Sequence, residues 1–254
     1  MNRLSKIFLI VLGLCSQLTA AVPERVLFVG NSYTYYENMT QVVAAFAASR
    51  DLAMQTRKSP PGGATLEQHW AGVKGKQTID SLNQIRTGQF DAVVLQEQSL
   101  RPITNSARMA NFADKLCAAI KESGGHPYLY LTWSRQQTPE TQSKLTESYE
   151  NVTRETGATI APVGLAWELA RTRQPDLILY SADGSHPSSA GSYLAACVLF
   201  STLTGEPSAD LPFRPSFTDT NGKAITLIQV NKKDAIFLQT IADEIMASYE
   251  QPFH

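Results

Sequence analysis

Short apolar runs alternate with segments of helical spacing along most of this chain. The apolar runs, typical of strands buried on both faces of a parallel sheet, occupy residues 25–29, 53–58 (the weakest), 91–95, 128–132 and 159–163. Helical spacing predicts helices over residues 39–49, 66–70, 79–87, 106–123, 139–156, 164–173, 188–203 and 231–249. The alternation predicts an α/β fold of the flavodoxin-like, three-layer α/β/α type. Its roughly five-stranded parallel sheet is covered by helices on both faces.

The last fifty residues follow a different pattern. Residues 204–223 are rich in Pro, Asp and Thr, so we expect an irregular connection there. The final helix is expected to place Ile236, Phe237, Ile241 and Ile245 together on one apolar face.

Length and composition fit a single enzyme-sized domain. The chain has 254 residues, of which 43% are hydrophobic, and a formal charge of −1. A chain of this length can bury a substantial core. With no excess of positive charge and no basic run, nucleic acid is not an expected partner.

The first 21 residues have the pattern of a secretory signal. Arg3 and Lys6 precede an apolar stretch over residues 7–14 that is too short to span a bilayer, and small residues follow at 19–21. We therefore expect a secreted or periplasmic domain of residues 22–254 with no stable membrane anchor. An uncleaved anchor is an alternative. A lipoprotein attached at Cys15 is less favoured, because Leu14 stands where such signals have a small residue.

Two cysteines, Cys117 and Cys197, remain within that domain. An oxidising compartment would permit a disulfide between them. Both lie in apolar, helix-like surroundings, so two separate buried thiols are an equally good prediction.

Two polar segments far apart in the sequence carry candidate catalytic residues. Ser32 comes directly after the first apolar run, and Asp183 stands three residues before His186. A serine hydroxyl is a poor nucleophile unless a neighbouring base takes its proton and a third group orients that base. Ser32, His186 and Asp183 would supply these three roles. Alternatively, Ser32 caps a helix and Asp183 belongs to an ordinary turn.

These segments resemble the SGNH (GDSL-type) family of serine esterases and lipases. The segment from Val26 to Thr34 resembles the first block of that family, with Asn31 in place of the usual aspartate. Pro61-Gly62-Gly63-Ala64-Thr65 resembles the glycine block, and Asp183-Gly184-Ser185-His186 matches the Asp-x-x-His block. The usual Gly-x-Asn-Asp block is replaced by Gln96-Glu97-Gln98-Ser99, so the chain departs from the family there.

The resemblance implies an oxyanion hole of three donors. The Ser32 amide would be the first donor and the Gly63 amide the second. The third donor in the family is an asparagine side chain. Here Gln98, which aligns with it, or Gln96, which lies nearer the strand end, would supply the amide instead.

Further residues near these segments are candidates for substrate binding. Asn31 and Tyr33 flank Ser32, while Trp133 and Arg135 follow the fourth strand and should lie at the same sheet edge. Trp133 could form a wall for the substrate or equally cap the core. The four histidines show no metal-ligand spacing, so we expect neither a metal nor a cofactor.

The sequence thus predicts a secreted serine esterase that acts through a Ser-His-Asp triad and a covalent acyl-enzyme. With no long apolar lid segment, its substrates are expected to carry short acyl groups such as acetyl, on a small molecule or a carbohydrate. Two alternatives lack catalysis. One is a flavodoxin-like module that binds a flavin through the loop at residues 31–36, and the other is a carbohydrate-binding relative.

Overall fold

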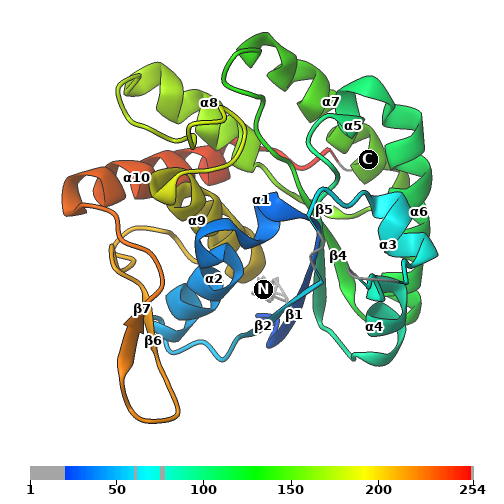
Figure 1. Cartoon of the computed structure of the whole chain (residues 1–254), viewed down its shortest axis with the longest axis horizontal. Helices are drawn as coiled ribbons and strands as arrows, with labels where there is room; N and C mark the ends of the chain where they lie inside the picture. Colours follow the sequence, from blue (N-terminus) through cyan, green and yellow to red (C-terminus); the bar gives the residue numbers. More distant parts are fainter. Residues whose placement is uncertain (1–20, 60–61, 75–77, 253–254) are drawn as a thin grey trace, which may run out of the picture.

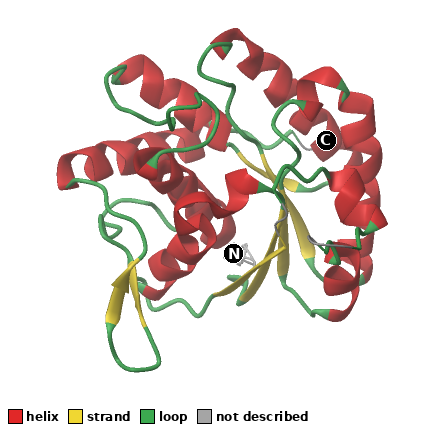
Figure 2. Cartoon of the chain, in the orientation of Figure 1, coloured by secondary structure: helices red, strands yellow, loops and turns green. Residues whose placement is uncertain are grey.

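The five apolar runs form one parallel sheet with strand order β2-β1-β3-β4-β5, which confirms the predicted fold class (Figures 1 and 2). The computed structural model describes residues 21–59, 62–74 and 78–252. The strands are β1 (Arg25–Val29), β2 (Gln55–Ser59), β3 (Ala92–Leu95), β4 (His126–Tyr130) and β5 (Thr159–Ala161).

Helices cover both faces of this sheet, and Figure 1 shows them as two layers on either side of it. One layer contains α2 (Met39–Ala48), α8 (Val163–Arg173), α9 (Ser189–Thr204) and α10 (Lys232–Ser248). The other contains α3 (Leu66–Ala71), α4 (Ser81–Thr87), α6 (Ser106–Glu122) and α7 (Gln142–Thr156). Shorter helical turns are α1 (Ser32–Tyr35), η1 (Tyr36–Asn38), α5 (Arg101–Thr104) and η2 (Pro139–Thr141). None of the described helices is long and apolar enough to cross a membrane.

Successive residues of the central strands face opposite layers. Val26 and Phe28 of β1 pack into the α2–α9 layer, whereas Leu27 and Val29 pack into the α3–α6 layer. Because every residue of the central strands is buried on one face or the other, these strands read as continuous apolar runs rather than as an alternating pattern.

The α9 helix is apolar around its whole circumference because it lies inside its layer. It packs against α2, α8 and α10, and the side chains from Gly191 to Ser201 are all buried. Ser188 caps its first turn and Gly205, with φ of 76°, ends it in the left-handed conformation.

The two expectations for the last fifty residues were partly wrong. The segment expected to be irregular enters a short antiparallel hairpin, β6 (Ser216–Thr218) and β7 (Ala224–Thr226), whose residues are mostly exposed. In α10, Ile236 is 54% exposed, and the buried face is formed by its neighbours Ala235, Leu238 and Ile241.

The edge of the sheet at β5 is closed by a side chain. Gln251 accepts a hydrogen bond from the Ile160 amide and donates one to the Ile160 carbonyl, both at 2.9 Å. These bonds occupy the positions that another strand would take and leave no free pairing edge at that residue.

The two cysteines of the domain are free and buried. Cys117 on α6 belongs to the core on one face of the sheet and Cys197 on α9 to the core on the other. Burial raises the pKa of the Cys117 thiol to about 12 and that of Cys197 well above its usual value. The structure therefore has two separate buried thiols rather than a disulfide between Cys117 and Cys197.

Candidate active site

The candidate residues gather where the strand order reverses. The chain leaves β1 toward the α2 layer and leaves the adjacent β3 toward the α6 layer. A crevice therefore opens beyond the carboxyl ends of these strands, which is the usual ligand site of such sheets. Ser32 follows β1, Gln98 follows β3 and Arg135 follows β4, so all three lie at this edge.

The structure brings Ser32, His186 and Asp183 into one hydrogen-bonded chain. Ser32 Oγ lies 2.8 Å from His186 Nε2, and His186 Nδ1 lies 2.5 Å from Asp183 Oδ2. A carboxylate only accepts, so Nδ1 carries the proton and Nε2 is free to accept from the serine hydroxyl. The hydrogen bond from His186, together with the amides of Ser185 and His186 on Oδ1, lowers the pKa of Asp183 to about 2.

Two hydrogen bonds fix the histidine loop against the serine loop and the core. The Tyr33 hydroxyl lies 2.6 Å from Ser185 Oγ, and Trp133 Nε1 donates to the Ser185 carbonyl at 3.0 Å. Within the loop, the Ser181 amide donates to the His186 carbonyl at 2.8 Å. These contacts hold the imidazole in position relative to Ser32.

Stacked aromatic rings support the loop that carries His186. Trp133 is only 1% exposed and lies between Tyr33, at a centroid distance of 4.6 Å, and Trp167, at 3.8 Å. Of the two alternatives for Trp133, the structure has the core position rather than the substrate wall, because the ring is covered on both faces by other rings. Tyr36, which sequence reasoning did not single out, stacks on His186 at 4.3 Å and lines the cleft.

Asn31 and Tyr33 line the cleft, but their polar groups are bound within the protein. Asn31 Nδ2 donates to the Ala64 carbonyl at 2.9 Å, and Oδ1 accepts from the Tyr33 amide at 3.2 Å. An aspartate at this position could not make the first of these bonds, since a carboxylate has no donor. Asn31 thus joins the serine loop to the glycine segment rather than offering its side chain to a ligand.

The side chains of Gln96 and Gln98 point in different directions. Gln96 is fully buried, and its Oε1 accepts from the Asn31 amide at 2.9 Å and the Thr34 hydroxyl at 3.0 Å, while Nε2 donates to the Glu97 carbonyl. Its amide is therefore unavailable to a ligand, and the alternative of Gln96 as oxyanion donor is wrong. A Cβ at Gly30 would overlap the Thr34 and Gln96 side chains, so this close approach requires a glycine.

Gln98 lies on the cleft with its amide group free. Its Oε1 accepts from the Leu100 and Arg101 amides at 2.9 and 3.1 Å, and its Nε2 has no hydrogen-bond partner among the described residues. Gly63 also lines the cleft, with φ of 67°. A Cβ there would meet no atom of the protein within 4 Å, so it is the left-handed backbone that favours glycine at this position.

The cleft has a volume of about 330 Å³ and is open to solvent. Its lining residues are Asn31, Ser32, Tyr33, Tyr35, Tyr36, Gly62, Gly63, Gln98, Ser99, Arg135, Ser185 and His186. A larger hollow of about 420 Å³ around Glu168 and Arg171 contains none of the three hydrogen-bonded residues. In the ranges that the structure describes, no group of His, Cys, Asp or Glu is placed to hold a metal ion.

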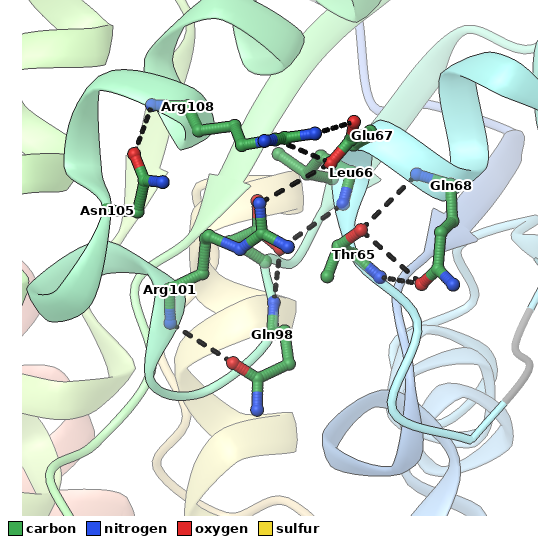
Figure 3. Close-up of polar contacts among 9 residues, drawn as sticks. Thr65, Leu66, Glu67, Gln68, Gln98, Arg101, Asn105 and Arg108 are labelled. Carbon is green, nitrogen blue, oxygen red and sulfur yellow. Dashed lines mark hydrogen bonds and ion pairs between the residues drawn. The ribbon is translucent and has the colours of Figure 1, made fainter.

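Glu97 is a buried carboxyl group that sequence reasoning passed over. Its Oε1 accepts from the Leu66 amide at 3.2 Å and the Gln98 amide at 2.6 Å, so it joins the first turn of α3 to the Gln98 loop. Figure 3 shows the surrounding polar contacts, in which Glu67 lies between Arg101 and Arg108. Burial raises the pKa of Glu97 to about 7, although both amides and Arg101 act in the opposite direction.

His69 is fully buried and is not among the residues that line the cleft. Its Nε2 donates to the Gly30 carbonyl at 2.9 Å, and Nδ1 lies 2.6 Å from Ser81 Oγ, so the ring is the tautomer with its proton on Nε2. Burial lowers the pKa of His69 to about 4. The residue holds α3 against the end of β1 and does not face the cleft.

Comparison with solved structures finds proteins of similar fold. A protein of Slackia heliotrinireducens assigned to the SGNH hydrolases has a TM-score of 0.62 and 30% identity, over 70% of this chain and 98% of that one. A DUF4886 family protein from Bacteroides uniformis has a TM-score of 0.66 at 19% identity, over 88% of this chain and 95% of that one. The acetyl xylan esterase AlAXEase has a TM-score of 0.58 at 11% identity, over 70% of this chain and 98% of that one. No family model and no curated protein matches the chain.

The protein has a three-layer α/β/α fold with its candidate site at the β1–β3 crevice. By its identity to the Slackia protein over nearly all of that protein's length, it belongs to the SGNH hydrolase family. The two more distant structures share the fold.

Glu97→Gln should change how the free energy of unfolding depends on pH. The pKa of Glu97 in the folded state, about 7, lies above the usual 4.5. The protonated side chain therefore contributes its full stabilisation of the folded state below pH 4.5, and this stabilisation is lost as the pH rises through 7. The variant stays neutral. Relative to it, the wild type should lose up to about 3 kcal/mol between about pH 5 and about pH 8.

Urea unfolding of both proteins across that range measures the difference. The titration of His69 is common to both proteins and cancels in the comparison. Parallel pH profiles for wild type and variant would contradict the raised pKa of Glu97.

Proposed function

We propose that this protein is a secreted serine esterase that hydrolyses carboxylic esters of short acyl groups through a covalent acyl-enzyme. The observation that carries the proposal is the hydrogen-bonded chain from Ser32 through His186 to Asp183, at the mouth of a solvent-open cleft. Membership of the SGNH hydrolases supports hydrolysis as the reaction class.

In the first half of the reaction, Ser32 Oγ attacks the ester carbonyl while His186 Nε2 takes the hydroxyl proton. The imidazolium that forms is stabilised by Asp183, which remains a carboxylate because its pKa is about 2. The tetrahedral intermediate collapses as His186 returns the proton to the departing alcohol. Water then attacks the acyl-serine with the same histidine acting as base, which releases the acid and restores Ser32.

The negative charge on the carbonyl oxygen would be stabilised by three donors. The Ser32 amide is the first of α1, and first-turn amides have no partner within the helix. Gly63 lines the same cleft and supplies a second amide. Gln98 Nε2 is the third, and its direction is fixed because its carbonyl oxygen is held by two backbone amides.

The substrate is proposed to carry a small acyl group such as acetyl, on a carbohydrate or another small alcohol. A cleft of about 330 Å³ is at the small end for ligand pockets, which supports short chains. The similar structures include acetyl xylan esterases, one of them from Geobacillus stearothermophilus. The signal-like residues 1–20 lie outside the described residues, and export from the cytoplasm stays part of the proposal.

Ser32→Ala should abolish ester turnover and labelling by a fluorophosphonate probe. Single triad deletions leave only about 10³–10⁴-fold catalysis over water. His186→Ala should cause a comparable loss and Asp183→Asn a smaller one. Ser143→Ala, which changes an exposed serine, is the matched control and should retain full activity.

Turnover above a few per cent in Ser32→Ala, with the fold intact by circular dichroism, would contradict the assignment of Ser32 as the nucleophile. An unlabelled, folded wild type would favour the carbohydrate-binding alternative.

A series of nitrophenyl esters from acetyl to palmitoyl should show the highest kcat/KM at acetyl. Longer chains exceed a cleft of about 330 Å³, and the lining of that cleft includes no aliphatic side chain to hold them. Acetate release from acetylated xylan, measured beside the series, tests the carbohydrate part of the proposal. A maximum at long chains would contradict the short-acyl specificity.

Gln98→Ala should lower kcat by about 10²–10³ with little change in KM, since the oxyanion exists only in the transition state. Gln96→Ala is the informative comparison. It should lower the free energy of unfolding, because it leaves the buried Asn31 amide and Thr34 hydroxyl without their acceptor. Unchanged kcat in Gln98→Ala would mean that backbone amides alone stabilise the oxyanion.

A further inference from the structure

Arg135 is a cation in the cleft whose side chain has no partner within the described protein. It follows β4 and lines the cleft together with Ser32 and His186. Its Nε is buried and makes no hydrogen bond, and no carboxylate in the described ranges forms an ion pair with it. By contrast, Arg108, Arg154 and Arg173 each pair with a glutamate.

The cleft offers no counter-charge of its own. Neither Asp nor Glu is among its lining residues. Asp183 is occupied by His186 and two amides, and Glu37 accepts from the Ser189 hydroxyl at 3.0 Å. The sequence has no Asp or Glu in residues 1–20, 60–61, 75–77 or 253–254. The guanidinium is therefore left to interact with whatever enters the cleft.

Hydroxyl groups surround this side of the cleft. The Tyr33 hydroxyl interacts with Ser185 Oγ at 2.6 Å and with the Ser99 side chain. Arg135 is close enough to this hydroxyl to lower its pKa, although burial raises that pKa by more. These hydroxyl groups are neutral and are bonded within the protein, so the guanidinium is the charged donor on this side of the cleft, and it suits an anion with several acceptor oxygens.

We propose that Arg135 forms a subsite for a carboxylate on the substrate, so that the preferred esters are anionic. The inference rests on the proposed esterase function, because Ser32 and the subsite share one cleft. The carboxylate could belong to the alcohol, as in an O-acylated uronic acid, or to the acyl group, as in the half-ester of a dicarboxylic acid. In both cases a charge-assisted, bidentate contact with Arg135 would position the ester over Ser32.

Two matched substrate pairs test the subsite and separate these sources. For the alcohol side, 4-acetoxybenzoate is compared with neutral 4-acetoxybenzamide. For the acyl side, the 4-nitrophenyl half-ester of glutarate is compared with its methyl-capped diester. In at least one pair, Arg135→Gln should reduce the anionic-to-neutral ratio of kcat/KM by about ten- to hundred-fold, mainly through KM. Arg135→Lys should retain part of the preference, and added salt should weaken it in the wild type.

Arg214→Gln is the matched control, because Arg214 is exposed, its guanidinium lies over the Phe213 ring, and it does not line the cleft. It should leave both ratios unchanged. Equal effects of Arg135→Gln on charged and neutral partners, or no effect in either pair, would overturn the subsite. Failure of the wild type to cleave any of the four esters would instead contradict the esterase function. In that case, calorimetric binding of glutarate to Ser32→Ala, and its loss on adding Arg135→Gln, decides the subsite by itself.

Discussion

The position of the nucleophile depends on the buried amide side chain of Gln96. One carbonyl oxygen accepts from both the Asn31 amide and the Thr34 hydroxyl, on either side of Ser32. These donors have no access to water, so the acceptor is required rather than merely favourable. Gly30 leaves just enough space for it, and the turn after β1 is thereby built against the end of β3.

The three residues Gln96, Glu97 and Gln98 extend this dependence to the whole site. Successive side chains point in different directions: Gln96 to the serine loop, Glu97 to the first amide of α3, and Gln98 to the cleft. The segment in which this chain departs most from its family's usual pattern therefore connects the loops that form the cleft. Substitution of each of these three residues would therefore disturb a different part of the cleft.

The sequence was sufficient to predict those strands whose positions depend on burial alone. Val26 to Val29 and Val93 to Leu95 are apolar because both faces of their strands are covered, and their runs predict the sheet. The hairpin β6–β7 was missed because its three-residue strands are mostly exposed and carry no apolar period.

The site was predictable only as far as a single segment determines it. The Asp183–His186 spacing specifies a local pair, and strand order brings Ser32 to it. Side-chain direction was not predictable, because it depends on contacts between segments. Trp133 is enclosed by rings from Tyr33 and Trp167, and Glu97 acquires its role from the Leu66 amide, 31 residues earlier in the chain.

The Tyr36 ring on His186 also determines how the imidazole can move. The two ring centroids lie 4.3 Å apart with planes within 17° of parallel, and the Tyr33 ring forms a T-shaped pair with the imidazole at a centroid distance of 5.7 Å. A swing of the imidazole away from Ser32 would have to displace or slide past Tyr36, which itself begins the tight turn η1. One face of the base is thus closed to solvent. Any water that reaches the base must approach from the opposite face or along the ring edge, so the architecture prescribes a direction of approach as well as a set of reacting groups.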